Sequence, residues 1–149
     1  MPRQQIDIRK ITPAEPAAVW RLLGDSFTWP SWTPIEWVIV DRHGDKHGLG
    51  EMRTIKLGRS RVREEIVERQ VESALSYKLS SGRPLRHYHV DVDLTPLEEE
   101  GTEIRWYTTV TSRVPGLGWL YRRQLRKVMQ EFVDGLAMHA AYEDGIGRE

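Results

Sequence analysis

The chain has 149 residues, about the length of one domain, and its 22 basic and 22 acidic residues balance to a formal net charge of zero. This balance argues against nucleic acid as a partner, because domains that bind DNA or RNA usually carry a basic excess. The absence of cysteine excludes disulfides, thiolate nucleophiles and cysteine-ligated zinc. The six tryptophans, against only two phenylalanines, are the most unusual feature of the composition.

The sequence also indicates where the protein works. No run approaches the roughly 18 apolar residues of a membrane span, and the first residues lack the apolar stretch of a signal peptide. We therefore expect a cytoplasmic protein, a monomer or a homodimer, with no stable membrane insertion.

The N-terminal region predicts a strand followed by a helix. Ile6 and Ile8 alternate with polar residues, which predicts a strand over residues 4–11. The run from Thr12 to Glu15 is typical of a helix start, with Thr12 as the N-cap, Pro13 at the first helical position and the glutamate three residues after the cap. This helix is expected to end near residue 23.

The next segment contains three of the tryptophans. Two prolines between residues 27 and 37 discourage long regular structure, so we expect a short second helix or turn there. Trp29, Trp32 and Trp37 lie in this segment.

Residues 37–112 predict six further strands joined by hairpins. Segments rich in valine, isoleucine, tyrosine and threonine are separated by turn signals. The strands are expected at residues 37–42, 50–56, 61–71, 75–81, 87–95 and 102–112. With the N-terminal strand they make an antiparallel meander of seven strands, which needs no crossover helix.

The C-terminal region predicts one long amphipathic helix. Apolar residues recur at three- and four-residue steps from residue 117 to residue 139. A helix of about 23 residues is about 35 Å long. The chain is thus expected to form one α+β domain over residues 1–149, in which a curved seven-stranded sheet wraps around this helix. A single helix cannot fill the concave side of such a sheet, so we expect a cavity between them.

Several short motifs resemble those of one superfamily. The motifs are Thr12-Pro13-Ala14-Glu15 with Val19-Trp20, Trp29-Pro30-Ser31-Trp32, Gly48-Leu49-Gly50 with Arg53, Gly101-Thr102-Glu103-Ile104-Arg105-Trp106, and Pro115-Gly116. Their order along the chain resembles the START/Bet v 1-like (SRPBCC) superfamily, in its polyketide cyclase/dehydrase and lipid-transport branch. The resemblance implies a helix-grip fold with a deep hydrophobic pocket between the last helix and the sheet. It does not identify a ligand, because members bind lipids, sterols, hormones or polyketides and only some are enzymes.

The candidate ligand-binding residues are mainly aromatic. Trp106 leads them, because the resemblance implies that its side chain points inward, although an ordinary core tryptophan is equally expected. Tyr77 and Tyr88 have hydroxyls that suit a ligand carbonyl or, equally, a backbone carbonyl. The full set is Trp29, Trp32, Trp37, Met52, Tyr77, Tyr88, Trp106, Thr108, Leu125, Met129 and Phe132.

The strand over residues 61–71 has no clearly apolar face. If Arg63, Glu65 and Arg69 face inward, Glu65 becomes a candidate acid or base. The resemblance implies that an interior arginine polarises a substrate carbonyl, with Tyr88 as a further catalytic candidate. The alternative, which we favour, is a solvent-facing ladder of ion pairs, because arginine and glutamate are seldom fully buried.

Other polar clusters favour solvent exposure. His87, His89, Asp91 and Asp93 alternate with apolar residues, so they are expected to face water rather than bind a metal. The basic block of Arg122, Arg123, Arg126 and Lys127 suits either an anionic membrane surface or, more simply, a solvated helix face. Signatures of nucleotide, metal and nucleophile enzymes are absent, so no cofactor is expected.

Three functions therefore remain open. The first is binding or transport of a hydrophobic small molecule, lipid-like or aromatic. The second is a polyketide cyclase or dehydratase that uses interior tyrosine, arginine and glutamate residues. The third is an interaction module of the same fold, which an extended apolar patch on the outer face of the sheet would favour.

Overall fold

The computed structural model describes residues 3–82 and 85–147. The chain begins with strand β1 (Gln4–Thr12), helix α1 (Pro16–Leu23), a 3-10 turn, η1 (Ser26–Thr28), and helix α2 (Trp29–Trp32). The strands that follow are β2 (Trp37–Arg42), β3 (Met52–Leu57), β4 (Ser60–Gln70), β5 (Ala74–Ser81), β6 (Leu85–Pro96) and β7 (Thr102–Ser112). The last element is the long helix α3 (Gly118–Gly147).

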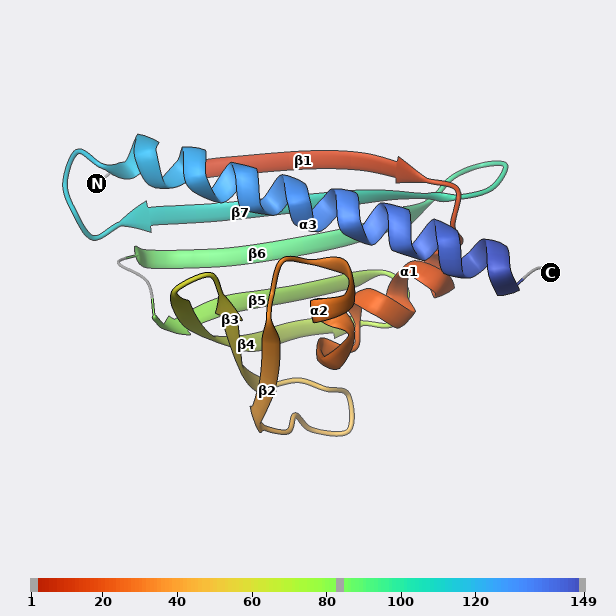
Figure 1. The fold of residues 1–149 in the computed structure, drawn as a ribbon, viewed down its shortest axis with the longest axis horizontal. Helices are drawn as coiled ribbons and strands as arrows, with labels where there is room; N and C mark the ends of the chain where they lie inside the picture. Colours follow the sequence, from red (N-terminus) through yellow and green to blue (C-terminus); the bar gives the residue numbers. More distant parts are fainter. Residues whose placement is uncertain (1–2, 83–84, 148–149) are drawn as a thin grey trace.

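The strands form one antiparallel sheet of seven strands in the order β1-β7-β6-β5-β4-β3-β2. Apolar and polar residues alternate along them, so that Val90 and Val92 of β6 are fully buried while Asp93 is exposed. Figure 1 shows the strands turning steadily, so that β2 and β3 run across the direction of β1 and β7. The α+β architecture and the seven strands predicted from the sequence are confirmed.

The helices cover one face of this sheet. Figure 1 shows α3 lying diagonally across it, from the side of β1 towards α1. Leu125, Met129, Phe132 and Leu136 point inward from α3 and are buried, as their helical spacing predicts. A close approach between α3 and α2 depends on Gly135, because a Cβ at this position would overlap the backbone oxygen of Trp32.

The predicted start of the first helix is wrong. Thr12 is the last residue of β1, and α1 begins at Pro16 with Glu15 as its N-cap residue. Both side chains are used elsewhere: the Thr12 hydroxyl donates to the carbonyl oxygen of Ala137 on α3 at 2.8 Å, and the Glu15 carboxylate accepts from the Gly101 amide at 3.2 Å. These long-range bonds replace the local cap that the sequence suggests.

The last helix is longer than predicted. It has 30 residues and continues past residue 139, because Ala140 is still fully buried. Tyr142 and Glu143, which follow it, are exposed. The apolar stripe therefore marks where the helix packs, but not where it ends.

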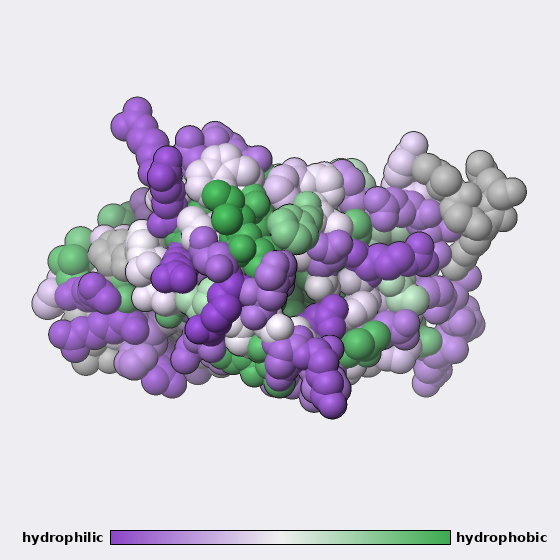
Figure 2. Space-filling model, turned by 90° about the horizontal axis from the view of Figure 1, so that it is seen from below, coloured by the Kyte–Doolittle hydropathy of each residue, from purple (hydrophilic) through white to green (hydrophobic). Residues whose placement is uncertain are grey.

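The outer face of the sheet is charged. Arg105 donates to both carboxylate oxygens of Asp7, at 3.1 and 2.9 Å, and Lys78 lies 4.0 Å from Glu65. Figure 2 views the molecule from the side of β2 and shows a mostly hydrophilic surface with a smaller hydrophobic patch near its middle. A charged outer face disfavours the interaction module, which needs an extended apolar patch there.

Candidate functional site

A buried ion pair joins β3 to β4 beneath the helices. Arg53 and Glu64 are cross-strand partners, and their side chains are 0% and 3% exposed. The Nε and Nη2 atoms of Arg53 both donate to Oε1 of Glu64, at 3.3 and 3.1 Å. Both residues share the inner face with Ile55, Val62 and Ile66, which are buried. Charges this far from water are stable only when they are paired, so removal of either partner leaves an uncompensated buried charge.

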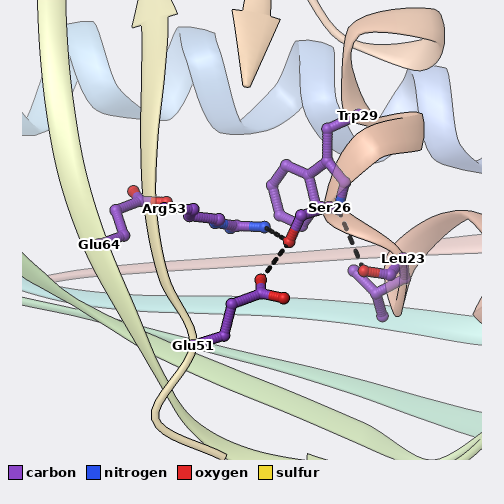
Figure 3. A network of polar contacts seen from close by, with 6 residues as sticks. All are labelled: Leu23, Ser26, Trp29, Glu51, Arg53 and Glu64. Atoms are coloured by element: carbon purple, nitrogen blue, oxygen red, sulfur yellow. Dashed lines mark hydrogen bonds and ion pairs between the residues drawn. The ribbon is translucent and has the colours of Figure 1, made fainter. Parts of the chain in front are cut away.

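The guanidinium of Arg53 has further partners, most of which Figure 3 shows. Its Nη1 donates to the Ser26 hydroxyl at 3.1 Å, and that hydroxyl donates to Glu51 at 2.6 Å. Its central carbon lies 4.0 Å from the ring centroid of Trp29 and 4.9 Å from that of Tyr77, which are cation–π distances. Because Ser26 and Trp29 come from η1 and α2, this network ties the helical segment to the sheet.

Next to Arg53 lies an aromatic cluster, which we define as Trp29, Trp32, Tyr77, Trp106 and Phe132. Ring centroids are separated by 4.8 Å for Trp29 and Trp32, 5.8 Å for Trp29 and Tyr77, and 5.9 Å for Trp106 and Phe132. The rings meet at tilted or edge-to-face angles, the arrangement that aromatic quadrupoles favour. The cluster fills much of the space between α3, α2 and the sheet.

A small internal hollow lies beside the cluster. Its volume is about 10 Å³, roughly the space for one water molecule. It is lined by apolar side chains from β3, β4 and α3 together with Glu64 and Tyr88: Ile55, Leu57, Val62, Glu64, Tyr88, Leu125, Val128, Met129 and Phe132. In this part of the interior, the deep pocket that the resemblance implies is occupied by the protein's own side chains.

A larger depression is open to solvent. It is a groove of about 770 Å³ between the end of β1, α2 and the C-terminal half of α3. Ile11, Met138 and Trp32 contribute to its walls, and an ion pair of 3.0 Å between Lys10 and Asp134 lies at the same place.

Two polar atoms on β7 are buried without hydrogen-bond partners among the described residues. They are Nε1 of Trp106 and Oγ1 of Thr108, and both residues are 0% exposed. Alternation along β7 places the two side chains on the inner face of the sheet. Most buried polar atoms in proteins are paired, so two unpaired polar atoms on the same face of one strand make the inner face of β7 unusual.

Tyr77 is a neutral hydrogen-bonding group in this interior. Burial raises the pKa of its phenol well above the ordinary value, and the nearby Tyr88 and Glu64 add to this effect. The positive charge of Arg53 opposes the shift but does not cancel it. The phenol therefore keeps its proton at any physiological pH and does not act as a base.

Most predicted ligand-binding residues lie together in the interior. The buried ones are Trp29, Trp32, Tyr77, Tyr88, Trp106, Thr108, Leu125, Met129 and Phe132. Two residues are placed differently from the prediction. Trp37 is half-buried at the start of the edge strand β2, where its ring lies 5.6 Å from the guanidinium of Arg61. Met52 is buried but stands outside the core cluster, because its cross-strand partner is the outward-facing Glu65.

Two of the three predicted catalytic residues of β4, Arg63 and Glu65, lie on the outer face of the sheet. Arg63 lies 3.5 Å from Asp41 with its side chain 47% exposed, and Glu65 lies on the outer face beside Lys78. Arg69 extends across the ring of Trp20, with 5.1 Å between the guanidinium carbon and the ring centroid. The inner face of β4 carries Val62, Glu64 and Ile66 instead, so the favoured solvent-facing arrangement is observed for Arg63 and Glu65. Arg69 differs, because a bulge between Ile66 and Glu68 places it opposite the buried Leu75, where it lies half-buried against α1. Of the catalytic candidates, Tyr88 is the one that is buried.

The histidine row of β6 lies on the outer face. His87 and Asp93 are exposed, and Nε2 of His89 lies 3.1 Å from the Asp91 carboxylate, which also accepts from the Ser76 hydroxyl. Within residues 3–82 and 85–147, no group of three acidic or histidine side chains is arranged to hold a metal ion.

Sequence reasoning missed Arg53 and Glu64 as a site. A signal was present, since Arg53 alternates with Ile55 and Leu57 on β3, and Glu64 lies between Val62 and Ile66 on β4. A charged residue on each apolar face of two adjacent strands indicates a buried pair.

The comparison with protein families agrees with this geometry. Residues 3–141 match the family described as polyketide cyclase / dehydrase and lipid transport. The chain belongs to this family. No curated protein is similar enough to match it.

Solved structures with the same fold carry different names. A START superfamily protein from Mycobacterium smegmatis is 12% identical, with a TM-score of 0.74, over 95% of this chain and 97% of that one. The protein XoxI from Bacillus cereus is 15% identical, with a TM-score of 0.74, over 93% and 95% of the two chains. Ara h 8.0201 is 14% identical, with a TM-score of 0.73, over 93% and 98%.

These likenesses establish a START/Bet v 1-like fold for the family member described here. Among its described helices, none combines the length and the apolar character required to cross a bilayer.

Proposed function

We propose that this protein binds a hydrophobic small molecule between α3 and the sheet. The observation that carries the proposal is the internal hollow, whose apolar wall is interrupted by Glu64 and Tyr88. An apolar wall with a few convergent polar groups is typical of small-molecule sites. The family, described as polyketide cyclase / dehydrase and lipid transport, supports the same ligand class.

A guest larger than one water molecule requires the hollow to widen. The two halves of α3 differ in how firmly they are packed. Val133, Leu136 and Ala140 in the second half are fully buried, whereas Tyr121 and Val128 in the first half are only partly buried. The first turns of α3, residues 118–124, contain no buried side chain, so displacement of this end breaks few apolar contacts and exposes the hollow at Leu125 and Val128.

A binding titration tests the proposal. A panel of fatty acids, sterols and polyphenols is added to the protein while intrinsic tryptophan fluorescence is recorded. We expect saturable changes with at least one class, and their absence with all classes contradicts the proposal. Val128→Phe fills the hollow from a half-buried position and is expected to abolish binding. The matched control, Met138→Ser, alters the external groove and should leave binding unchanged.

If Met138→Ser abolishes binding and Val128→Phe does not, the guest occupies the external groove instead. Thermal denaturation of both variants distinguishes loss of the site from loss of the fold.

One observation favours a second candidate function, cyclisation of a polyketide. Glu64 lines the hollow and is paired with Arg53, and a carboxylate at this place can accept a proton from a carbon next to a substrate carbonyl. The resulting carbanion attacks a second carbonyl carbon, and the alkoxide formed takes the proton back from Glu64. Glu64 then removes the remaining proton of the attacking carbon and passes it to the hydroxyl; the C–O bond breaks, water leaves and a carbon–carbon double bond forms. Mass spectrometry of a linear poly-β-ketone incubated with the protein tests this reaction. We expect loss of one water from the substrate with the wild type but not with Glu64→Gln, and an unchanged substrate mass contradicts catalysis.

A further inference from the structure

Two hydrogen-bonding groups on the inner face of β7 are left without a hydrogen bond by the packing of the interior. The indole N–H of Trp106 and the hydroxyl of Thr108 are fully buried, and neither has a partner among the described residues. Leaving such groups unpaired destabilises the folded protein.

The neighbours of these groups on the adjacent strands are aliphatic. Trp106 lies opposite Ile8 of β1 and Val92 of β6. Thr108 likewise lies opposite Ile6 and Val90, and all four of these neighbours are buried, at 0–4% exposure. The side chains on both adjacent strands therefore offer no acceptor to either group.

The chemistry of the two groups restricts what can satisfy them. An indole N–H only donates, whereas a threonine hydroxyl donates or accepts. An acceptor oxygen is therefore the group that suits both. A charged acceptor such as a carboxylate is disfavoured, because Arg53, the one fully buried cation in the described part of the chain, is already paired with Glu64.

We propose, resting on the binding function above, that the guest is a neutral carbonyl compound whose oxygen is bound by Trp106 Nε1 and Thr108 Oγ1. The aromatic cluster then packs around the body of the guest, and Phe132, which lies 5.9 Å from the Trp106 ring, is the ring displaced to admit the oxygen. The two β7 groups thereby select a ketone over a hydrocarbon of the same shape.

A matched pair of probes tests this selection. 9-Fluorenone and fluorene have the same planar shape, but only the first carries a carbonyl oxygen. Equilibrium dialysis measures the affinity of each probe for the wild type and for two variants. Thr108→Val removes one donor at nearly constant volume, and Trp106→Phe removes the other donor together with part of the ring system. We expect the wild type to bind fluorenone about tenfold more tightly or better, and each substitution to bring the ratio towards one.

Two control variants separate this role from general effects. Thr109→Val makes the same change on the half-buried outer face of β7, and Trp119→Phe does so at a side chain that is 62% exposed. Both should retain the wild-type preference. Without ligand, Thr108→Val should unfold at the same temperature as the wild type or higher, because it removes an unpaired hydroxyl. A clearly lower melting temperature means that the hydroxyl is already paired in the free protein, which overturns the proposal.

The remaining outcomes distinguish the two proposals. Equal affinity of the wild type for both probes, or a preference that survives both substitutions, overturns the carbonyl site and leaves hydrophobic binding intact. Failure to bind either probe, together with the failed panel titration, overturns the binding function itself and the carbonyl site with it.

Discussion

The ion pair of Arg53 and Glu64 provides the sharpest test of how this interior is stabilised. The substitution Glu64→Gln keeps the shape of the side chain but leaves the guanidinium of Arg53 without a counter-charge. The groups that still contact Arg53 in this variant, the Ser26 hydroxyl and the rings of Trp29 and Tyr77, are neutral. Breaking a buried pair in this way costs about 3–5 kcal/mol of the free energy of unfolding. For a protein of this size, such a loss lowers the melting temperature by roughly 6–20 °C.

Replacing both partners has a different effect. Arg53→Met with Glu64→Leu removes both charges, so the double variant should be far less destabilised than Glu64→Gln alone. Asp7→Asn is the matched control, because Asp7 pairs with Arg105 on the surface, where such a bond contributes at most about 1 kcal/mol.

Urea denaturation followed by tryptophan fluorescence measures these differences. With a slope of about 1–3 kcal/mol per molar urea, Glu64→Gln should lower the midpoint by about 1 M or more. If Glu64→Gln costs no more than Asp7→Asn, the buried charges are not mutually dependent, and the reasoning is refuted.

Two further predictions concern single side chains. Gly135→Ala should destabilise the protein by roughly 1–3 kcal/mol, because its new methyl group meets the backbone of Trp32. Gly145→Ala faces open space and should stabilise the helix by up to about 1 kcal/mol. Circular dichroism melts of the two variants check this contrast. Tyr77 has a raised pKa in the folded state, so its contribution to stability is complete below the unfolded pKa of about 10 and is lost as the pH rises towards the folded value. Urea midpoints measured between pH 9 and 11 should therefore fall less steeply for Tyr77→Phe than for the exposed control Tyr142→Phe, and equal slopes contradict the assignment.

The strand pattern and the helical stripe were sufficient to predict the order of the elements. Alternating residues predicted β4 at residues 61–71, and the structure has it at Ser60–Gln70. The strand's inner face was ambiguous because glutamates occur on both sides of it. What decides between them is Arg53 on the neighbouring strand, a contact that only the register of β3 against β4 creates. A pattern read along one strand does not contain this information.

The misplaced helix start has a similar cause. Thr12 and Glu15 have the spacing of a local cap, but each bonds to a residue far along the chain, Ala137 and Gly101 respectively. The packing of the interior was also beyond sequence reasoning. A tryptophan side chain suits the wall of a cavity and a packed core equally well, so the sequence does not distinguish the two. The close approach of Trp32 to Gly135 brings α2 and α3 together, and the aromatic cluster then packs between them and the sheet.

The two ends of α3 are held to the rest of the protein unequally. The Thr12 hydroxyl bonds to the carbonyl oxygen of Ala137 in the C-terminal half of α3, whereas residues 118–124 at the N-terminal end contain no buried side chain. The amide hydrogens of the N-terminal turns of α3 should therefore exchange with deuterium sooner than those around Leu136, without global unfolding. For the proposed guest, this difference predicts entry at the N-terminal end of α3, while the C-terminal half of the helix stays packed on the sheet.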